Sequence, residues 1–207
     1  MIADHGSGMT VTRRQALLGF TALPLAPLLG STETRSAGQL IAAARARIGV
    51  TTLYDPAYVS LAYPGGDVRD DRGVCIDVII RAYRTAFGFD FQQHLHEDMK
   101  ANFAAYPKIW GLSRTDRNID HRRVPNVETW LSRHGHELPV RDWRPGDLMT
   151  CRVGGSLPHI GILTDRRGRD GHWMAVHNIG LGTHEDSRIW GYSHKRRFRF
   201  LPEPIDA

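Results

Sequence analysis

Apolar residues recur at helical spacing in the stretch from 74 to 87, and they define the most regular element that the sequence predicts. A helix with such a continuous apolar face is expected to be buried in the core. The repeat stops at Gly88, a residue type that commonly ends helices. The apolar face consists of Val74, Val78, Ile79 and Tyr83.

Three further stretches predict helices, at 39–48, 92–105 and 125–134, because they combine helix formers with plausible stops. The segment 51–72, by contrast, is dense in Gly and Pro, which indicates turns. Its tyrosines argue for an ordered structure. We therefore interpret this segment as the wall of a cleft that leads to Cys75.

Beyond residue 144 the pattern changes to short strands separated by turns. Strands are predicted at 148–153, 159–164 and 173–178, and a last strand at 195–201 is expected at an edge of the sheet. Short strands joined by tight turns form antiparallel sheets. Helices first and strands afterwards predict a single α+β domain, with the helices packed on one face of a small antiparallel sheet.

The N-terminus carries a targeting pattern. Arg13 and Arg14 directly precede an uncharged apolar run from 16 to 29, which two prolines interrupt. This run is shorter than the ~20 residues of a membrane span, so it predicts a cleavable export signal of the twin-arginine (Tat) type. We assign 1–37 to this signal and a linker absent from the mature protein, and 38–207 to the single domain.

The composition adds little to the choice of partner. The chain has 207 residues and a formal net charge of +5, which favours anionic surroundings. The arginines are scattered along the sequence, so we expect no nucleic-acid partner. Apart from the export signal, no segment is long and apolar enough to predict a stable membrane span, and we expect a monomer.

Cys75 falls in the first turn of the predicted helix at 74–87. Unpaired N–H groups and the positive end of the helix dipole favour a thiolate there. A thiolate is the nucleophile that acyl transfer needs. One alternative is an ordinary buried cysteine. Another is a disulfide between Cys75 and Cys151, since export leads to an oxidising compartment. The presence of two cysteines does not by itself distinguish a disulfide from one reactive thiol and one buried cysteine.

The sequence H-L-H-E-D at 94–98 has the spacing of some metallohydrolase motifs. Residues two apart do not share a helix face, however. We interpret this stretch as a solvated helical face, and we expect neither a metal nor another cofactor.

The polar stretch 111–123 predicts a loop that ends in Arg122 and Arg123. Adjacent arginines can hold carboxylates, which makes these two residues candidates for substrate binding. An ordinary surface loop is the alternative.

The order of these pieces resembles a known arrangement. A Cys opens a helix, a Pro-Gly-Asp turn opens a strand, and the next strand begins with His-Ile-Gly-Ile. This resembles the NlpC-type and CHAP-type branch of papain-like cysteine peptidases, which act on bacterial cell-wall peptides. The region from Ile48 to Gly182 more closely resembles an uncharacterised bacterial domain family grouped with them. The matching stretches are I-G-V-T-x-x-Y-D-P, Y-P-G-G-D-V, D-R-G-V-C-x-D-V-x-I-R-A-Y, H-E-D-M-x-x-N-F, N-I-D-H-R-R-V-P-N, P-G-D, L-P-H-I-G-I and H-N-I-G.

The resemblance implies a role for several residues. Cys75 would be the nucleophile and His159 the base that takes its proton. His177 would orient the His159 ring, with Asn178 as a competitor, because alternation along a strand lets only one of the two face the site. The hydroxyl of Tyr54 would help to bind an oxyanion.

The chain also departs from the usual Asp-Cys-Ser-Gly motif, which reads Val74-Cys75-Ile76-Asp77 here. The loss of the small residues after the cysteine changes the expected oxyanion pocket. Asp77 lies around the helix from Cys75, so we expect it to form a structural salt bridge or a helix cap.

Together these features predict a periplasmic or secreted cysteine hydrolase with a papain-like (NlpC/CHAP-type) α+β fold. It would cleave amide bonds, with peptidoglycan peptides as the expected substrate. The alternative is a non-catalytic binding module of the cell envelope that keeps the cleft. The joint presence of Cys75, His159 and His177 favours the enzyme.

The export prediction can be tested in cells. Replacing Arg13 and Arg14 by lysines should leave unprocessed precursor in the cytoplasm, because the Tat route reads the arginine pair. Immunoblots of cell fractions would show it. Normal processing of this variant would contradict Tat export.

Overall fold

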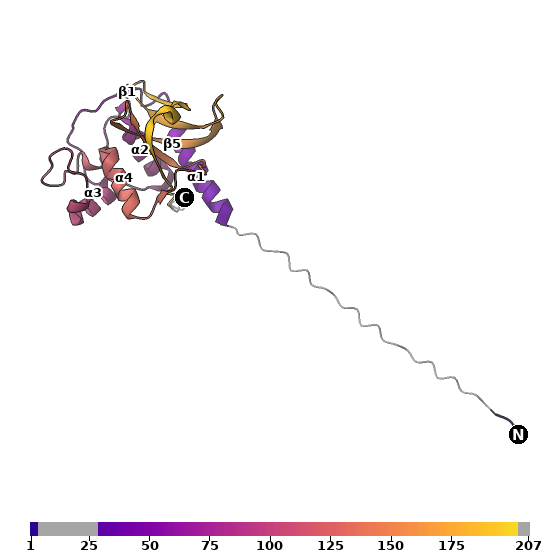
Figure 1. Cartoon of the computed structure of the whole chain (residues 1–207). Helices are drawn as coiled ribbons and strands as arrows, with labels where there is room; N and C mark the ends of the chain where they lie inside the picture. Colours follow the sequence, from indigo (N-terminus) through magenta and orange to yellow (C-terminus); the bar gives the residue numbers. More distant parts are fainter. Residues whose placement is uncertain (4–28, 203–207) are drawn as a thin grey trace.

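The computed structural model describes residues 1–3 and 29–202 (Figure 1). The twin-arginine pair and nearly all of the predicted export signal lie outside the described residues. No helix in the described part is long and apolar enough to cross a membrane.

Within residues 29–202, four α-helices precede the main sheet, as the sequence predicted. They are α1 (Leu29–Arg45), α2 (Cys75–Phe87), α3 (Phe91–Ala101) and α4 (Val124–Arg133). Short 3₁₀ helices follow α3, precede α4 and interrupt the strands, as η1 (Phe103–Ala105), η2 (Asp120–Arg122) and η3 (Arg188–Gly191).

The first helix differs most from its prediction. We expected 39–48, whereas α1 runs over Leu29–Arg45 and so begins within the stretch that we assigned to signal and linker. Side-chain contacts hold this early part against the domain. Ala37 is buried, and Glu33 pairs with Arg199 at 2.7 Å. These contacts join residues far apart in sequence, so local propensity could not reveal them.

The strands form a six-stranded antiparallel sheet with the order β3-β8-β4-β5-β6-β7. Their bounds are β3 (Glu137–Leu138), β4 (Leu148–Val153), β5 (Leu157–Arg167), β6 (Trp173–Asn178), β7 (Thr183–Asp186) and β8 (Ser193–Phe198). The placement of the last strand at an edge was wrong, because β3 pairs with β8 and covers it. A separate parallel pair joins β1 (Leu53–Tyr54) to β2 (Arg72–Gly73).

The two faces of the sheet carry different layers. Alternate strand residues such as Ile160 and Ile162 pack with the four helices in the main core. The other face is covered around η3 by a smaller cluster that includes Cys151 and Leu163, with aromatic residues packed against it. In Figure 1, α3 and α4 lie together at one side of the molecule, and the orange and yellow strands lie at the other. The structure is thus a mixed α+β single domain with helices packed on one sheet face.

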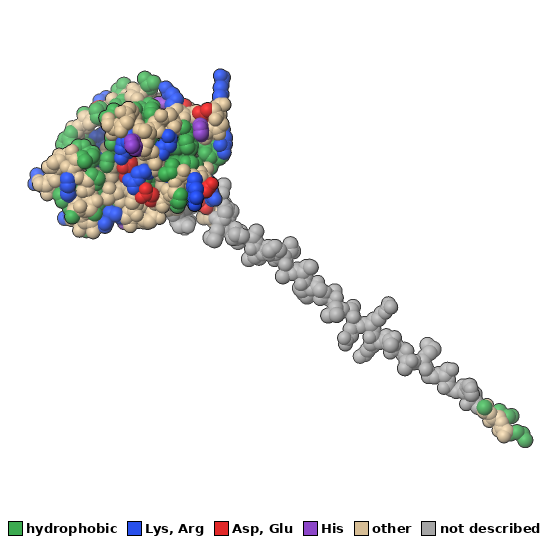
Figure 2. All heavy atoms as spheres, in the orientation of Figure 1, with side chains coloured by type: hydrophobic (Ala, Val, Ile, Leu, Met, Phe, Trp, Pro, Cys, Tyr) green, Lys and Arg blue, Asp and Glu red, His purple; other side chains and the backbone are tan. Residues whose placement is uncertain are grey.

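Charged side chains are distributed over the surface. On the face shown in Figure 2, Lys and Arg side chains form several separate groups among polar and apolar neighbours. A nucleic-acid backbone is bound by a continuous basic stripe, and the visible face does not present one.

A buried ion pair fixes the start of α2. The Asp77 carboxylate accepts a hydrogen bond from the backbone N–H of Val74 at 2.7 Å, which caps the helix. The same carboxylate receives two hydrogen bonds from the Arg122 guanidinium, both at 2.9 Å. Both side chains are almost completely buried. The predicted role of Asp77 as a salt bridge or cap is therefore confirmed, and it performs both tasks.

We expect Arg122→Met to destabilise the domain by about 3–5 kcal/mol, because it leaves the Asp77 charge buried without its partner. Urea denaturation would measure the loss. Arg69→Met is a matched control: Arg69 pairs with Asp71 at 2.9 Å at the surface, so its loss should be below about 1 kcal/mol. Equal losses for the two variants would contradict a structural role for the buried pair.

Candidate active site

Cys75 lies next to the place where the pairing between β5 and β6 ends. The ladder between these strands begins at the pair Ile162 and Val176. Two residues earlier in β5, the backbone N–H of Ile160 is hydrogen-bonded to the Cys75 sulfur instead of to a strand. The thiol therefore lies next to the strand segment that carries His159.

A hydrogen-bonded relay leads away from His159. Its Nε2 lies 2.8 Å from Nδ1 of His177, and Nε2 of His177 lies 3.1 Å from Oδ1 of Asp186. Both imidazoles are buried. The structure thus brings His159 and His177 together and adds a carboxylate, Asp186, that the sequence did not reveal.

The relay determines the tautomers of the two rings. Although burial raises the pKa of Asp186, hydrogen bonds from Arg188 and His177 hold it below its ordinary value, so the group is a carboxylate that only accepts. His177 therefore donates from Nε2 and accepts at Nδ1. His159 then donates from Nε2, which leaves a lone pair on its Nδ1. Burial lowers the pKa of His159 to about 3 and that of His177 to about 4, so both rings are neutral near pH 7.

Asp186 was missed because its strand is hidden in the sequence. The stretch Thr183-His184-Glu185-Asp186 is polar throughout and shows no apolar alternation, yet it forms β7 beside β6. The register pairs His177 with His184 and Ala175 with Asp186, so Asp186 lies diagonally across from His177 on the same face. The acidic residues a short turn after His177 were the signal that could have found it.

The competition between His177 and Asn178 is resolved by their contacts. The Asn178 side chain donates to the carbonyl of Gly73 at 3.1 Å and accepts from the N–H of Gly180 at 3.2 Å. It therefore ties β6 to the residue that precedes the Cys75 helix. His177, and not Asn178, contacts His159.

Tyr54 lies beside the thiol. Strand pairing places it opposite Gly73, and it lines a cavity of about 350 Å³ together with Cys75. Partial burial, with the nearby charge of Asp77, raises the pKa of Tyr54 to about 12, which keeps its hydroxyl a hydrogen-bond donor. Tyr63, which precedes the pair Gly65-Gly66, instead donates to Glu97 at 3.3 Å.

The two adjacent arginines have different roles. Besides pairing with Asp77, Arg122 donates to the carbonyls of Ala57 and Asp55. These internal partners occupy the Arg122 guanidinium, and substrate binding by Arg122 stays a prediction. Both arginines line the same cavity as Cys75.

The family of the chain follows from sequence comparison. Residues 41–200 match a family described as a domain of unknown function, DUF1287. The chain belongs to the DUF1287 family. YijF of Escherichia coli (strain K12), an uncharacterized protein, is 48% identical to it over 162 residues, which cover 76% of this chain and 78% of YijF. Most of the domain, including every residue of the relay, lies within the matched region.

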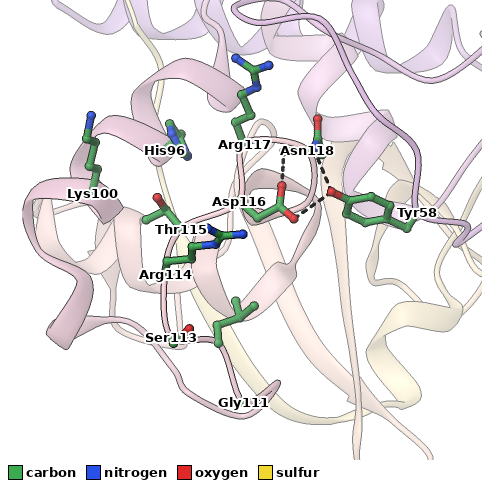
Figure 3. A pocket seen from close by; sticks show the side chains of 11 residues that line it. Tyr58, His96, Lys100, Gly111, Ser113, Arg114, Thr115, Asp116, Arg117 and Asn118 are labelled. Carbon is green, nitrogen blue, oxygen red and sulfur yellow. Dashed lines mark hydrogen bonds between the residues drawn. The ribbon is translucent and has the colours of Figure 1, made fainter.

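A second cavity of this DUF1287 domain lies on the other side of the loop 110–119. It is lined mainly by 111–118, with Tyr58, His96 and Lys100 (Figure 3). The Tyr58 hydroxyl donates to Asp116 at 2.9 Å. Its histidine, His96, has Nδ1 3.2 Å from Oδ2 of Asp120.

The H-L-H-E-D stretch does not gather as a metal site in the DUF1287 fold. His94 stacks on Phe89, and Asp98 pairs with Arg133. His96, which lies two residues from each of them along α3, instead contacts Asp120.

Within the described part of the chain, His177, His184 and Asp186 could hold a metal ion, with ligand atoms within 4.8 Å of one another. The guanidinium of Arg188 already contacts two of these residues. It lies 2.6 Å from Asp186 and 3.1 Å from Nε2 of His184. Two of the three residues are therefore already bound to a side-chain cation.

The state of the thiol differs from the prediction. Both cysteines are free and buried, so no disulfide joins them. Burial raises the pKa of Cys75 to about 12, against opposing hydrogen bonds from backbone N–H groups. A helix dipole contributes about 0.3–1 kcal/mol, less than one pKa unit, whereas full burial shifts a pKa by up to ~3–5 units. Burial outweighs the dipole, and Cys75 rests as a thiol.

We therefore expect iodoacetamide to label this DUF1287 protein faster as the pH rises. With a pKa near 12, the thiolate fraction and the rate should increase about tenfold per pH unit from pH 6 to 9. Mass spectrometry of labelled peptides would give the rate at each cysteine. Cys75→Ser should remove most of the labelling, and Cys151→Ser should leave it. A rate that is already constant below pH 7 would instead indicate a thiolate–imidazolium pair.

Proposed function

We propose that this protein is an exported cysteine hydrolase that cleaves amide bonds in peptidoglycan peptides. The observation that carries the proposal is the relay from Asp186 through His177 to His159, which leaves a basic lone pair on the strand beside the Cys75 thiol. A buried cysteine with only a structural role requires no such arrangement of tautomers.

The domain architecture supports the proposal by analogy. A nucleophile at the start of a helix and a base on the following antiparallel sheet are the arrangement of papain-like enzymes of the NlpC and CHAP type. Fold likeness alone does not assign a function. The proposed hydrolysis therefore rests on the residues of the site. The proposed peptidoglycan substrate rests on the family resemblance and on the proposed Tat export to the periplasm or beyond.

The reaction proceeds in two stages. When a substrate carbonyl reaches the thiol, Nδ1 of His159 takes the Sγ proton, and the sulfur attacks the carbonyl carbon. The oxyanion is stabilised by the backbone N–H of Cys75 and the hydroxyl of Tyr54. The C–N bond then breaks, the leaving amine takes the proton from His159, and a thioester remains on Cys75. Water, deprotonated by His159, hydrolyses the thioester and restores the thiol.

The relay stabilises the transient imidazolium of His159. As His159 gains a proton on Nδ1, its Nε2–H bond to His177 strengthens, and the Asp186 carboxylate balances the positive charge through His177. Arg188 holds Asp186 in place without entering the relay. Because both rings have low pKa values at rest, His159 stays in its basic form down to about pH 5.

The proposal is tested with the purified mature protein and cell-wall sacculi. New amino and carboxyl ends in the released fragments, identified by mass spectrometry, would establish amide hydrolysis and show which bond is cut. EDTA should leave the rate unchanged, since a thiol mechanism needs no metal. Activity that is lost on chelation, restored by zinc and indifferent to Cys75→Ala would contradict the proposal.

The variants should behave as one unit. We expect Cys75→Ala and His159→Ala each to lose roughly a thousandfold or more in kcat, and the double variant to lose hardly more. His177→Ala should lose less, on the order of a hundredfold, because it removes an orienter and not a bond-making atom. Cys151→Ala is the matched control and should keep its activity. Thermal melts would confirm that all variants fold, and additive losses would argue against a shared mechanism.

A further inference from the structure

Arg123 lines the cavity beside Cys75, and in the described part of the chain it has no ion-pair partner. It is the last residue before α4, and it lines the cavity that Cys75 and Tyr54 share. Its Nη1 atom is buried and has no hydrogen-bond partner. No ion pair of this side chain occurs in the described ranges. The residue as a whole is only partly buried, but a buried guanidinium nitrogen normally has a hydrogen-bond partner, so this atom is an exception.

The guanidinium is held in place without being neutralised. It lies over the ring of Trp110, with 4.2 Å between the guanidinium carbon and the ring centroid. A cation–π contact of this kind orients the planar group and leaves its N–H donors free. Arg122, the neighbouring residue, shows the opposite arrangement, with its donors satisfied by Asp77 and backbone carbonyls.

The nearest acidic residues do not pair with Arg123. Asp120 and Asp116 act on it through their charges at a distance, while burial lowers the pKa of the Arg123 guanidinium. Asp116 instead receives the Tyr58 hydroxyl, and Asp120 faces His96. The cavity therefore contains an oriented cation whose donors are open to a ligand.

We propose that Arg123 binds a carboxylate of the substrate next to the amide bond that Cys75 attacks. A guanidinium matches a carboxylate with two parallel hydrogen bonds, and the cavity of about 350 Å³ is within the range of small-molecule sites. The preferred substrates are then acidic peptides with a free carboxylate close to the scissile bond. The cleavage step rests on the proposed function, whereas carboxylate binding can be measured without turnover.

The experiment uses the mature chain with Cys75→Ala, which cannot turn substrate over. Muropeptides released from sacculi by a muramidase are divided, and the carboxyl groups of one half are amidated with carbodiimide and ammonium. Calorimetric titration compares the two pools. Hydrogen bonds to charged groups contribute ~1.5–3 kcal/mol, so the acidic pool should bind roughly tenfold to a hundredfold more tightly.

Further variants in the same background identify the residue. Arg123→Gln should remove the preference for the acidic pool. Arg123→Lys should keep part of it, since the charge remains and the planar fork is lost. Arg114→Gln is the matched control: Arg114 is exposed on the same loop and lines the other cavity, so its loss should leave the preference intact. Thermal melts show whether each variant folds.

The outcomes separate the two proposals. A preference that survives Arg123→Gln, or binding to neither pool, overturns the inference. If the unaltered protein cleaves sacculi but the Cys75→Ala protein binds both muropeptide pools equally, the hydrolase is supported and the role of Arg123 is overturned. A preference that depends on Arg123, in a protein that cleaves no sacculi, supports the carboxylate site and overturns the hydrolase.

Discussion

The buried carboxylate of Asp77 is the interaction on which the rest of the site depends. It caps α2 at Val74 and binds Arg122, and Arg122 in turn holds the carbonyls of Asp55 and Ala57. The carboxylate also constrains what precedes it. Gly73 has a φ of +151°, and a Cβ atom at this position would lie 2.9 Å from Oδ2 of Asp77. One side chain thus constrains the backbone before Cys75 and, through Arg122, anchors the wall of the cleft.

Burial decides the electrostatics of the resting site. The thiol and both imidazoles have pKa values shifted toward their neutral forms, so the charges lie around them, at the Asp77–Arg122 pair, at Asp186 and at Arg123. In the proposed reaction, a positive charge that develops on His159 would be balanced by Asp186. The resting thiol is correspondingly protected from chance oxidation, which requires a thiolate.

Much of the fold was predictable because its elements have a clear apolar period. The strands β4 and β6 have the predicted bounds, and α2 differs by one residue at its start. The elements that were missed or misplaced depend on distant contacts. β7 is entirely polar, and β8 is covered by the two residues of β3.

The candidate site was predictable to the same extent. Cys75, His159 and His177 were found from their order along the chain, and the structure brings the two histidines together. The neighbouring arginines look alike in the sequence, and only the packing of Asp77 and Trp110 distinguishes Arg122 from Arg123. Asp186 contacts His177 only through the register of a strand without apolar alternation.

The relay has a consequence for the order in which the molecule assembles. His159, His177 and Asp186 lie on three successive strands, and contacts between neighbours in sequence form early because they close short loops. Cys75 reaches Ile160 only across half of the domain. The strands β5, β6 and β7 are therefore expected to bring the two histidines and Asp186 together before Cys75 packs against Ile160. Under the proposed function, the thiol and the His159 imidazole would be coupled only once the whole domain has closed.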